Sequence, residues 1–140
     1  MASVGRVQVR VFAVALLVAA GVAVAWAQKG RVTNPQEIAD VLTVRDVRVE
    51  GDTVRATLVN HAPRRLTDVR LLIRHSWLWN NERNPGSDNP GRTDTYTLPD
   101  EIPAGGTYSL VYKIVPPLPR RSDGRFVTTV EVIGFTEVGF

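Results

Sequence analysis

The side chains that could perform acid–base or nucleophilic chemistry are few and scattered in this chain. It has no cysteine, and its two histidines are His61 and His75. Nucleophilic catalysis needs a hydroxyl or thiol, a base and an orienting acid within hydrogen-bonding distance, and neither histidine stands in a motif that supplies them. A zinc site needs three or four converging ligands, and two histidines on separate segments do not indicate one. We therefore predict no catalytic residue, no metal site and no cofactor.

A calcium site is the alternative that the polar run in HSWLWNNERNPGSDNPGRTD, residues 75–94, leaves open. This run holds Glu82, Asp88, Asp94 and several asparagines, and calcium takes oxygen ligands of these kinds. The spacing matches no EF-hand loop. The repeated NPG places Pro and Gly at the two central positions of successive turns, which is typical of type II turns. We interpret the run as a turn-rich loop.

The start of the chain has the layout of a secretory signal peptide. Arg6 and Arg10 form a basic region, residues 11–24 are an uncharged apolar run, and Ala25 and Ala27 form a cleavage site of the A-x-A type. We predict that residues 1–27 are a signal peptide and that the protein is exported to a periplasmic or extracellular location. The alternative is an uncleaved anchor, because residues 11–27 reach the lower limit for a membrane-spanning helix.

Export changes how the composition is interpreted. The chain has 17 Lys and Arg against 14 Asp and Glu, but two of the arginines belong to the predicted signal peptide, which leaves the remainder nearly neutral. Nucleic-acid-binding domains are usually strongly basic, so we expect no nucleic-acid partner. An exported chain without cysteine has no disulfides and must be stabilised by its core. The length gives room for one domain.

The elements that would position these residues are strands. Residues 28–40 are polar and predict a linker, whereas the chain from Val41 alternates apolar and polar residues in short runs separated by Gly and Pro. This spacing indicates an all-β fold. We predict an immunoglobulin-like antiparallel β-sandwich of about seven strands over residues 41–140, preceded by an N-terminal signal helix. A phase slip at Arg45 and Asp46 predicts a β-bulge.

The longest strand candidate, residues 66–79, predicts which side the tryptophans face. Side chains alternate between the two faces of a strand, and the apolar residues share one parity with both tryptophans and His75. We therefore expect Trp77 to be buried, and His75 to be a packed, hydrogen-bonded residue near the edge of the core. The long loop after Trp79 exceeds the usual hairpin connection.

Two segments resemble the bacterial FxLYD-type extracytoplasmic domains, which have an immunoglobulin-like fold. In VRVEGDTVRATLVNHAPRRLTDVRLLI, a strand ends at Asn60 and the next begins with Leu66 and Val69, and LPDEIPAGGTYSLVYKI is similar to the later turn and aromatic strand. The resemblance covers residues 45–135. The run 75–94 replaces a short hairpin, and the motif that gives the family its name is absent. The resemblance implies an interaction or structural module and supplies no functional residues.

These observations predict a non-catalytic binding or structural module of the bacterial cell envelope. Long loops on rigid scaffolds often carry function, so we expect contact with a protein partner through the strand end and loop within residues 75–94. The membrane would be contacted only through an uncleaved N-terminal segment. One alternative is a membrane-anchored version of the same domain; another is a small envelope hydrolase with a carboxylate pair or His75 in a cleft. The candidate contact residues are Trp79, Asn80, Asn81, Glu82, Arg83 and Arg92.

Overall fold

A computed structural model describes residues 30–87 and 89–139. The predicted signal peptide, residues 1–27, lies outside the described residues. Within them, no helix is long and apolar enough to cross a membrane. The elements in chain order are β1 (Gly30–Val32), α1 (Pro35–Val41), β2 (Leu42–Glu50), β3 (Thr53–Asn60), β4 (Arg65–Trp79), β5 (Arg92–Thr97), β6 (Thr107–Lys113) and β7 (Gly124–Val138).

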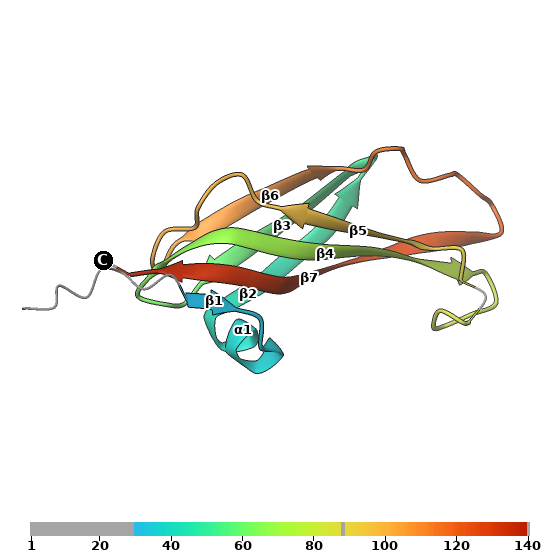
Figure 1. Cartoon of the computed structure of the whole chain (residues 1–140). Coiled ribbons are helices and arrows are strands. Elements are labelled where there is room, and N and C mark those ends of the chain that lie inside the picture. Colours follow the sequence, from blue (N-terminus) through green and yellow to red (C-terminus); the bar gives the residue numbers. More distant parts are fainter. Residues whose placement is uncertain (1–29, 88, 140) are drawn as a thin grey trace, which may run out of the picture.

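The strands form two antiparallel sheets that pack face to face. One sheet has four strands in the order β1-β7-β4-β5, and the other has three in the order β2-β3-β6. Figure 1 shows the two layers, with α1 beside β1 and β2 at one side of the sandwich. This arrangement confirms the predicted all-β sandwich of seven strands.

The predicted linker is corrected by the structure, because most of it is part of the folded domain. β1 pairs with the end of β7, and α1 crosses from one sheet to the other with Ile38 packed into the core, 6% exposed. Asn34 caps this helix by accepting a hydrogen bond from the Gln36 amide at 2.9 Å, and Pro35 opens its first turn. Asn followed by Pro is a recognised signal for a helix start. Within the described residues, regular structure therefore starts at Gly30.

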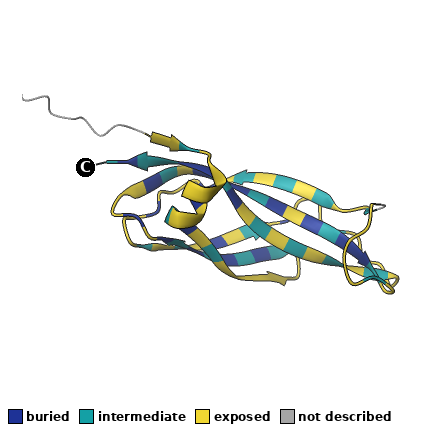
Figure 2. Ribbon diagram, turned by 90° about the horizontal axis from the view of Figure 1, so that it is seen from below, coloured by how far each residue is buried: buried dark blue, intermediate teal, exposed yellow. Residues whose placement is uncertain are grey.

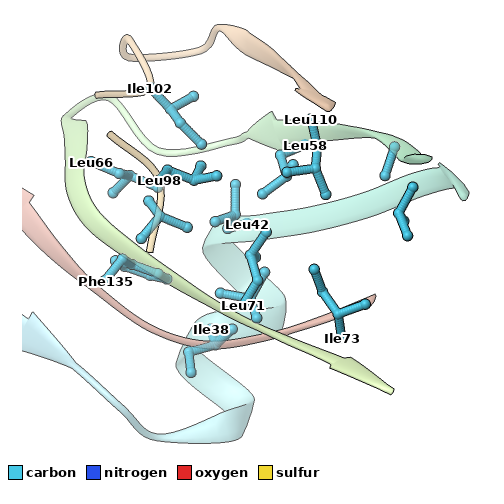
Figure 3. Packing of buried hydrophobic residues seen from close by; sticks show 14 of the residues in the cluster. Ile38, Leu42, Leu58, Leu66, Leu71, Ile73, Leu98, Ile102, Leu110 and Phe135 are labelled. Atoms are coloured by element: carbon cyan, nitrogen blue, oxygen red, sulfur yellow. The ribbon is translucent and has the colours of Figure 1, made fainter. Parts of the chain in front are cut away.

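The core lies between the sheets and consists of the inward-facing positions of the alternating strands. In β3 every second residue is buried, so Val54 and Leu58 are 0% exposed. Figure 3 shows side chains from both sheets meeting with Ile38 of α1 and Ile102 of the β5–β6 connection. The whole cluster comes from residues 38–135. A domain of this size with its own core can fold without further segments.

A β-bulge interrupts β2, as the phase slip predicted. The pairing with β3 shifts between Arg45 and Arg48, and Asp46 has a φ of 57°. Every residue of β2 from Arg45 onward is exposed. The first half of β2 therefore packs over the core, whereas its second half is exposed to solvent.

The buried side chain of Asn60 joins two turns at one end of the sandwich. Its Nδ2 donates to the carbonyl oxygens of Arg64 at 2.8 Å and Pro103 at 3.0 Å, and its Oδ1 accepts from the Ala62 amide at 2.9 Å. Asn60 is 1% exposed. One side chain thus links the β3–β4 turn to the β5–β6 connection.

The opposite end of the sandwich is formed by two strands that extend beyond the three-stranded sheet. β4 and β7 are 15 residues long each, whereas β3 has 8 residues and β6 has 7. The two long strands pair along their whole length, from Arg65 with Val138 to Trp79 with Gly124. In Figure 1 they extend beyond β3 and β6 toward the loops that join β4 to β5 and β6 to β7. We call this region, which includes Trp79 and Gly124 at the ends of β4 and β7, the loop end.

Candidate functional site

The two tryptophans near the end of β4 form an aromatic cluster at the loop end. Trp77 is 1% exposed, which confirms its predicted burial. The Trp79 ring is partly exposed and meets Trp77 edge-on, with ring centroids 5.4 Å apart. Phe126 of β7 packs against the other side of Trp77 at 4.8 Å. Alternation along β4 and β7 brings these rings together, because Trp77 and Phe126 are paired across the strands.

An arginine from the β6–β7 loop covers both tryptophan rings. The guanidinium carbon of Arg121 lies 5.4 Å from the centre of Trp77 and 5.2 Å from that of Trp79, a cation–π arrangement. Asp123 fixes the guanidinium by accepting two hydrogen bonds of 2.6 and 2.9 Å. These hydrogen bonds lower the pKa of Asp123. No sequence pattern predicts this contact, because it depends on the path of the β6–β7 loop.

The first residues of the β4–β5 loop are tied to the scaffold. Asn80 donates its amide N–H to the Asp123 carbonyl at 3.0 Å and its side chain to the Ser122 carbonyl at 3.0 Å. Glu82 accepts a hydrogen bond from the Trp79 amide at 3.3 Å. These contacts join the two loops of the loop end to each other and to β4.

The exposed candidates of the same loop are Asn81 and Arg83. Both are exposed, and neither side chain takes part in the hydrogen bonds or ion pairs found among residues 30–87 and 89–139. Trp79, Asn81 and Arg83 therefore present one apolar, one amide and one cationic group on a loop whose base is fixed.

The end of the loop returns to β4 through Asn89. Its Oδ1 accepts hydrogen bonds from the Trp77 amide at 2.7 Å and the Gly91 amide at 2.8 Å. A Cβ atom at Gly91 would collide with the carbonyl oxygen of His75. The chain can turn back into β5 so close to β4 only because this position has no side chain.

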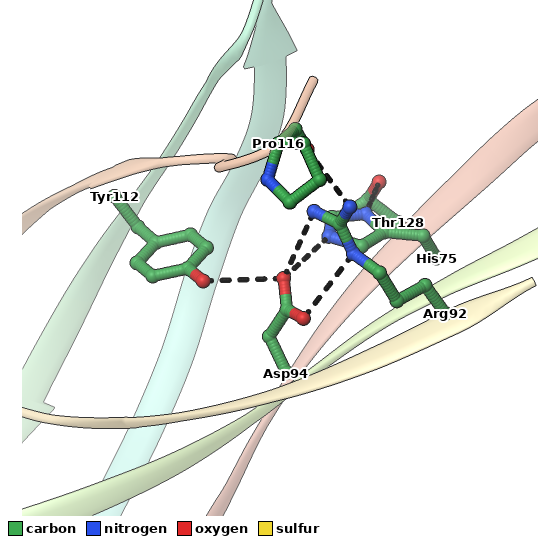
Figure 4. Close-up of polar contacts among 6 residues, drawn as sticks. All are labelled: His75, Arg92, Asp94, Tyr112, Pro116 and Thr128. Atoms are coloured by element: carbon green, nitrogen blue, oxygen red, sulfur yellow. Dashed lines mark hydrogen bonds and ion pairs between the residues drawn. The ribbon is translucent and has the colours of Figure 1, made fainter. Parts of the chain in front are cut away.

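A buried polar cluster lies between the sheets next to the aromatic rings. His75 is 0% exposed, and its Nδ1 is 2.9 Å from the hydroxyl of Thr128 on β7. Its Nε2 lies 3.6 Å from the carboxylate of Asp94 on β5. Figure 4 shows these side chains with Arg92 and Tyr112 directed toward Asp94. His75 is thus a packed, hydrogen-bonded histidine, as its parity predicted.

Asp94 is the centre of this cluster. It accepts hydrogen bonds from the Tyr112 hydroxyl at 3.1 Å and from Arg92 at 3.3 Å, and Arg92 Nε is 3.2 Å from its other oxygen. Arg92 also donates to the Pro116 carbonyl at 2.8 Å. The structure therefore places Arg92 in an internal network (Figure 4). The side chains of Asn81 and Arg83 are not part of this network.

The electrostatics of the cluster keep its histidine neutral. Burial lowers the pKa of His75; Asp94 acts against this effect, and Arg92 adds to it. Burial and the hydrogen bond to Asp94 raise the pKa of Tyr112. The cluster therefore holds one carboxylate with Arg92 as its counter-ion, next to an uncharged imidazole and phenol.

The order of Thr128, His75 and Asp94 is that of a hydroxyl, a base and an acid, which is the arrangement of nucleophilic catalysis. Its setting is different from that of an active site. The imidazole is fully buried, and the cavities beside Arg64 (about 420 Å³) and Ile38 (about 380 Å³) are lined by residues outside the cluster. This geometry packs the loop end and gives His75 no open face toward a substrate.

Metal binding was the alternative for the polar loop. Among residues 30–87 and 89–139, no three His, Asp or Glu side chains converge in a way that could hold a metal ion. Asp94 and Glu82 bind Arg92 and the Trp79 amide respectively. Asp88 lies outside the described residues.

The chain was compared with known proteins in three ways. No protein-family model matches the sequence. Neither the curated proteins nor the solved structures give a significant match.

Proposed function

We propose that this domain is a non-catalytic binding module of the bacterial cell envelope, exported by residues 1–27 and contacting a protein partner through the loop end. The contact residues would be Trp79, Asn81 and Arg83. Asn80, Glu82 and Arg92 would support this surface without contacting the partner, because their side chains hold the loops together.

The observation that supports this proposal most is the fixed aromatic base beneath an exposed loop. Trp79 is partly exposed but held between Trp77 and Arg121. Interfaces are enriched in tryptophan and arginine, which act as anchors at their centres. A surface that is already ordered loses less conformational entropy when it binds. The loop end therefore combines residue types suited to a protein contact with a rigid support.

A hydrolase is the second candidate, and one observation favours it. Thr128, His75 and Asp94 stand in the order that nucleophilic catalysis needs. The full burial of His75 opposes it, because a general base must reach the proton that it removes. We therefore place the binding module first.

Site-specific photo-crosslinking in the native host tests the contact surface. A photoreactive amino acid at Arg83 of the full chain should give a cross-linked adduct with a distinct envelope protein. The matched control is the same amino acid at Lys113, which is also exposed and lies on β6. An adduct of equal yield at both positions, or none at position 83, would contradict the proposal.

Export is tested separately by the intact mass of the protein recovered from the envelope. Cleavage after Ala27 gives a chain that begins at Gln28. A membrane-bound form that keeps residues 1–27 would favour the anchored alternative.

A further inference from the structure

The outer edge of β7 is a long and regular strand edge with little cover. β1 pairs only with residues 135–137 of β7, whereas β4 pairs with β7 on its other side from Gly124 to Val132 without a register shift. Within residues 30–87 and 89–139, the backbone groups of residues 124–134 that point away from β4 therefore have no partner strand, although α1 and β2 lie near residues 130–132. Figure 2, which looks at the sandwich from below, shows the long strands continuing past α1 toward the loop end.

The other edge on this side of the sandwich is interrupted by a bulge, whereas the free stretch of β7 is regular from Gly124 to Val132. β2 carries a bulge at Asp46 and charged residues at Arg45, Arg48 and Glu50. Bulges and charges are devices that protect edge strands from association. The free stretch of β7 instead has a 39% exposed Val127 next to two threonines.

The charges on the free edge are arranged symmetrically. Arg125, Val127, Thr129 and Glu131 all lie on the outer, exposed face of β7. When two β7 edges align antiparallel with Thr128 at the centre, Arg125 of each copy lies opposite Glu131 of the other. Opposite charges at facing positions stabilise strand pairing. Neither Arg125 nor Glu131 takes part in the ion pairs found among residues 30–87 and 89–139.

We propose that β7 is a self-association edge, through which two copies of this chain join their four-stranded sheets into one continuous sheet. The contact is isologous: the same edge serves both copies, and Arg125 and Glu131 form two equivalent ion pairs across the two-fold axis. The occupant is a second copy, because this sequence complements its own charge pattern at that register.

The inner side of the same edge offers apolar surface to the second strand. A cavity of about 380 Å³ opens between α1, β2 and β7, and Ile38, Leu42, Val130 and Val132 contribute to its lining. In the proposed register Phe126 of the second copy lies opposite Val130. The main-chain hydrogen bonds, the ion pairs and this apolar groove therefore act along one edge.

Charge reversal tests the inference with the domain from Gln28, whose core is complete. Sedimentation velocity of the unaltered domain should show a monomer–dimer equilibrium below about 1 mM. Glu131→Arg alone and Arg125→Glu alone should each give monomers, because like charges then face each other. An equimolar mixture of the two variants should form a heterodimer, because each charge again faces its opposite. Lys113→Glu, an exposed reversal on β6, is the control and should dimerise normally.

A cysteine experiment repeats the test in the full chain, which has no native cysteine. Val127→Cys and Thr129→Cys chains should form a mixed disulfide when they are combined under mild oxidation, because these positions face each other in the proposed register. A domain that stays monomeric up to about 1 mM, or variants whose mixture stays monomeric, would overturn the proposal. A dimer that survives both single reversals would also overturn it, because it would use another surface.

Discussion

The two ends of the sandwich are stabilised in different ways. At the end that contains Leu66 and Ile102, apolar side chains from both sheets fill the interior. Asn60 is buried there, and its side chain forms hydrogen bonds with nearby backbone groups. At the loop end, His75 and both tryptophans keep buried ring nitrogens without a hydrogen-bond partner. Unpaired buried polar groups cost free energy. The loop end is therefore the less optimised half of the molecule.

The largest effect is expected in the apolar half. Phe135→Ala removes a ring that is 2% exposed and should lower the free energy of unfolding by about 4 kcal/mol, because it removes buried area and leaves a cavity. Urea denaturation followed by circular dichroism measures this loss. Val111→Ala on β6, where the side chain is exposed, is the control and should change stability by less than about 0.5 kcal/mol. Equal effects at the two positions would contradict the location of the core.

The next effect is expected in the polar cluster. Asp94→Asn should cost about 2 kcal/mol, because Arg92 then loses its counter-ion and Tyr112 its charged acceptor. The same denaturation measurement applies, with Asp100→Asn on the exposed turn as the matched control. A neutral result at Asp94 would show that the cluster contributes packing alone.

A smaller effect is expected at the aromatic cluster. Trp77→Phe should cost about 1–2 kcal/mol, since the smaller ring leaves space beside Phe126, while loss of the unpartnered ring N–H offsets part of that cost. The domain from Gln28 has only Trp77 and Trp79, so its emission should be blue-shifted and should lose the bluer component in this variant. Complete quenching of both rings by acrylamide in the folded protein would contradict the burial of Trp77.

The pH dependence of stability should be weaker in His75→Gln than in the unaltered protein. Burial lowers the pKa of His75 below its ordinary value of 6.5. As the pH falls below about 6.5, the unfolded chain binds a proton that the folded protein excludes, so the protein loses stability down to the folded pKa, by at most about 1.4 kcal/mol per pH unit. Urea titrations at pH 7.5 and 5.5 measure the change. An identical change in His75→Gln would mean that other groups cause it.

The smallest effect on stability is expected at the exposed loop. Arg83→Ala should change the free energy of unfolding by less than about 0.5 kcal/mol, because the side chain is exposed. The same change should reduce the yield of the partner adduct. Crosslinking from Asn81 measures that yield, with Lys113→Ala as the control. A normal yield of adduct from the Arg83→Ala variant would mean that the loop only connects β4 to β5.

The alternation along the strands was sufficient to predict the sandwich, the bulge in β2 and the buried faces of His75 and Trp77. It was not sufficient for β1 and α1, because three strand residues and a helix with one buried residue, Ile38, carry almost no periodicity. The Asn34-Pro35 cap was the signal that could have revealed the helix. The cluster around Asp94 was hidden for another reason: it depends on the register of β5 against β4, which a long loop does not determine.

The hydrogen bonds of Asn60 also affect the rate at which nearby amide protons exchange with solvent. The Leu66 and Ile102 amides each donate to the other's carbonyl, and Asn60 fastens the turns on both sides of that pair. One turn cannot open while the other stays closed, so their amide protons should exchange with solvent together, and only as slowly as the whole domain unfolds. At the loop end the sheets are joined by the hydrogen bond from Tyr112 on β6 to Asp94 on β5, and we expect the amide protons there to exchange through smaller openings that leave these two turns closed.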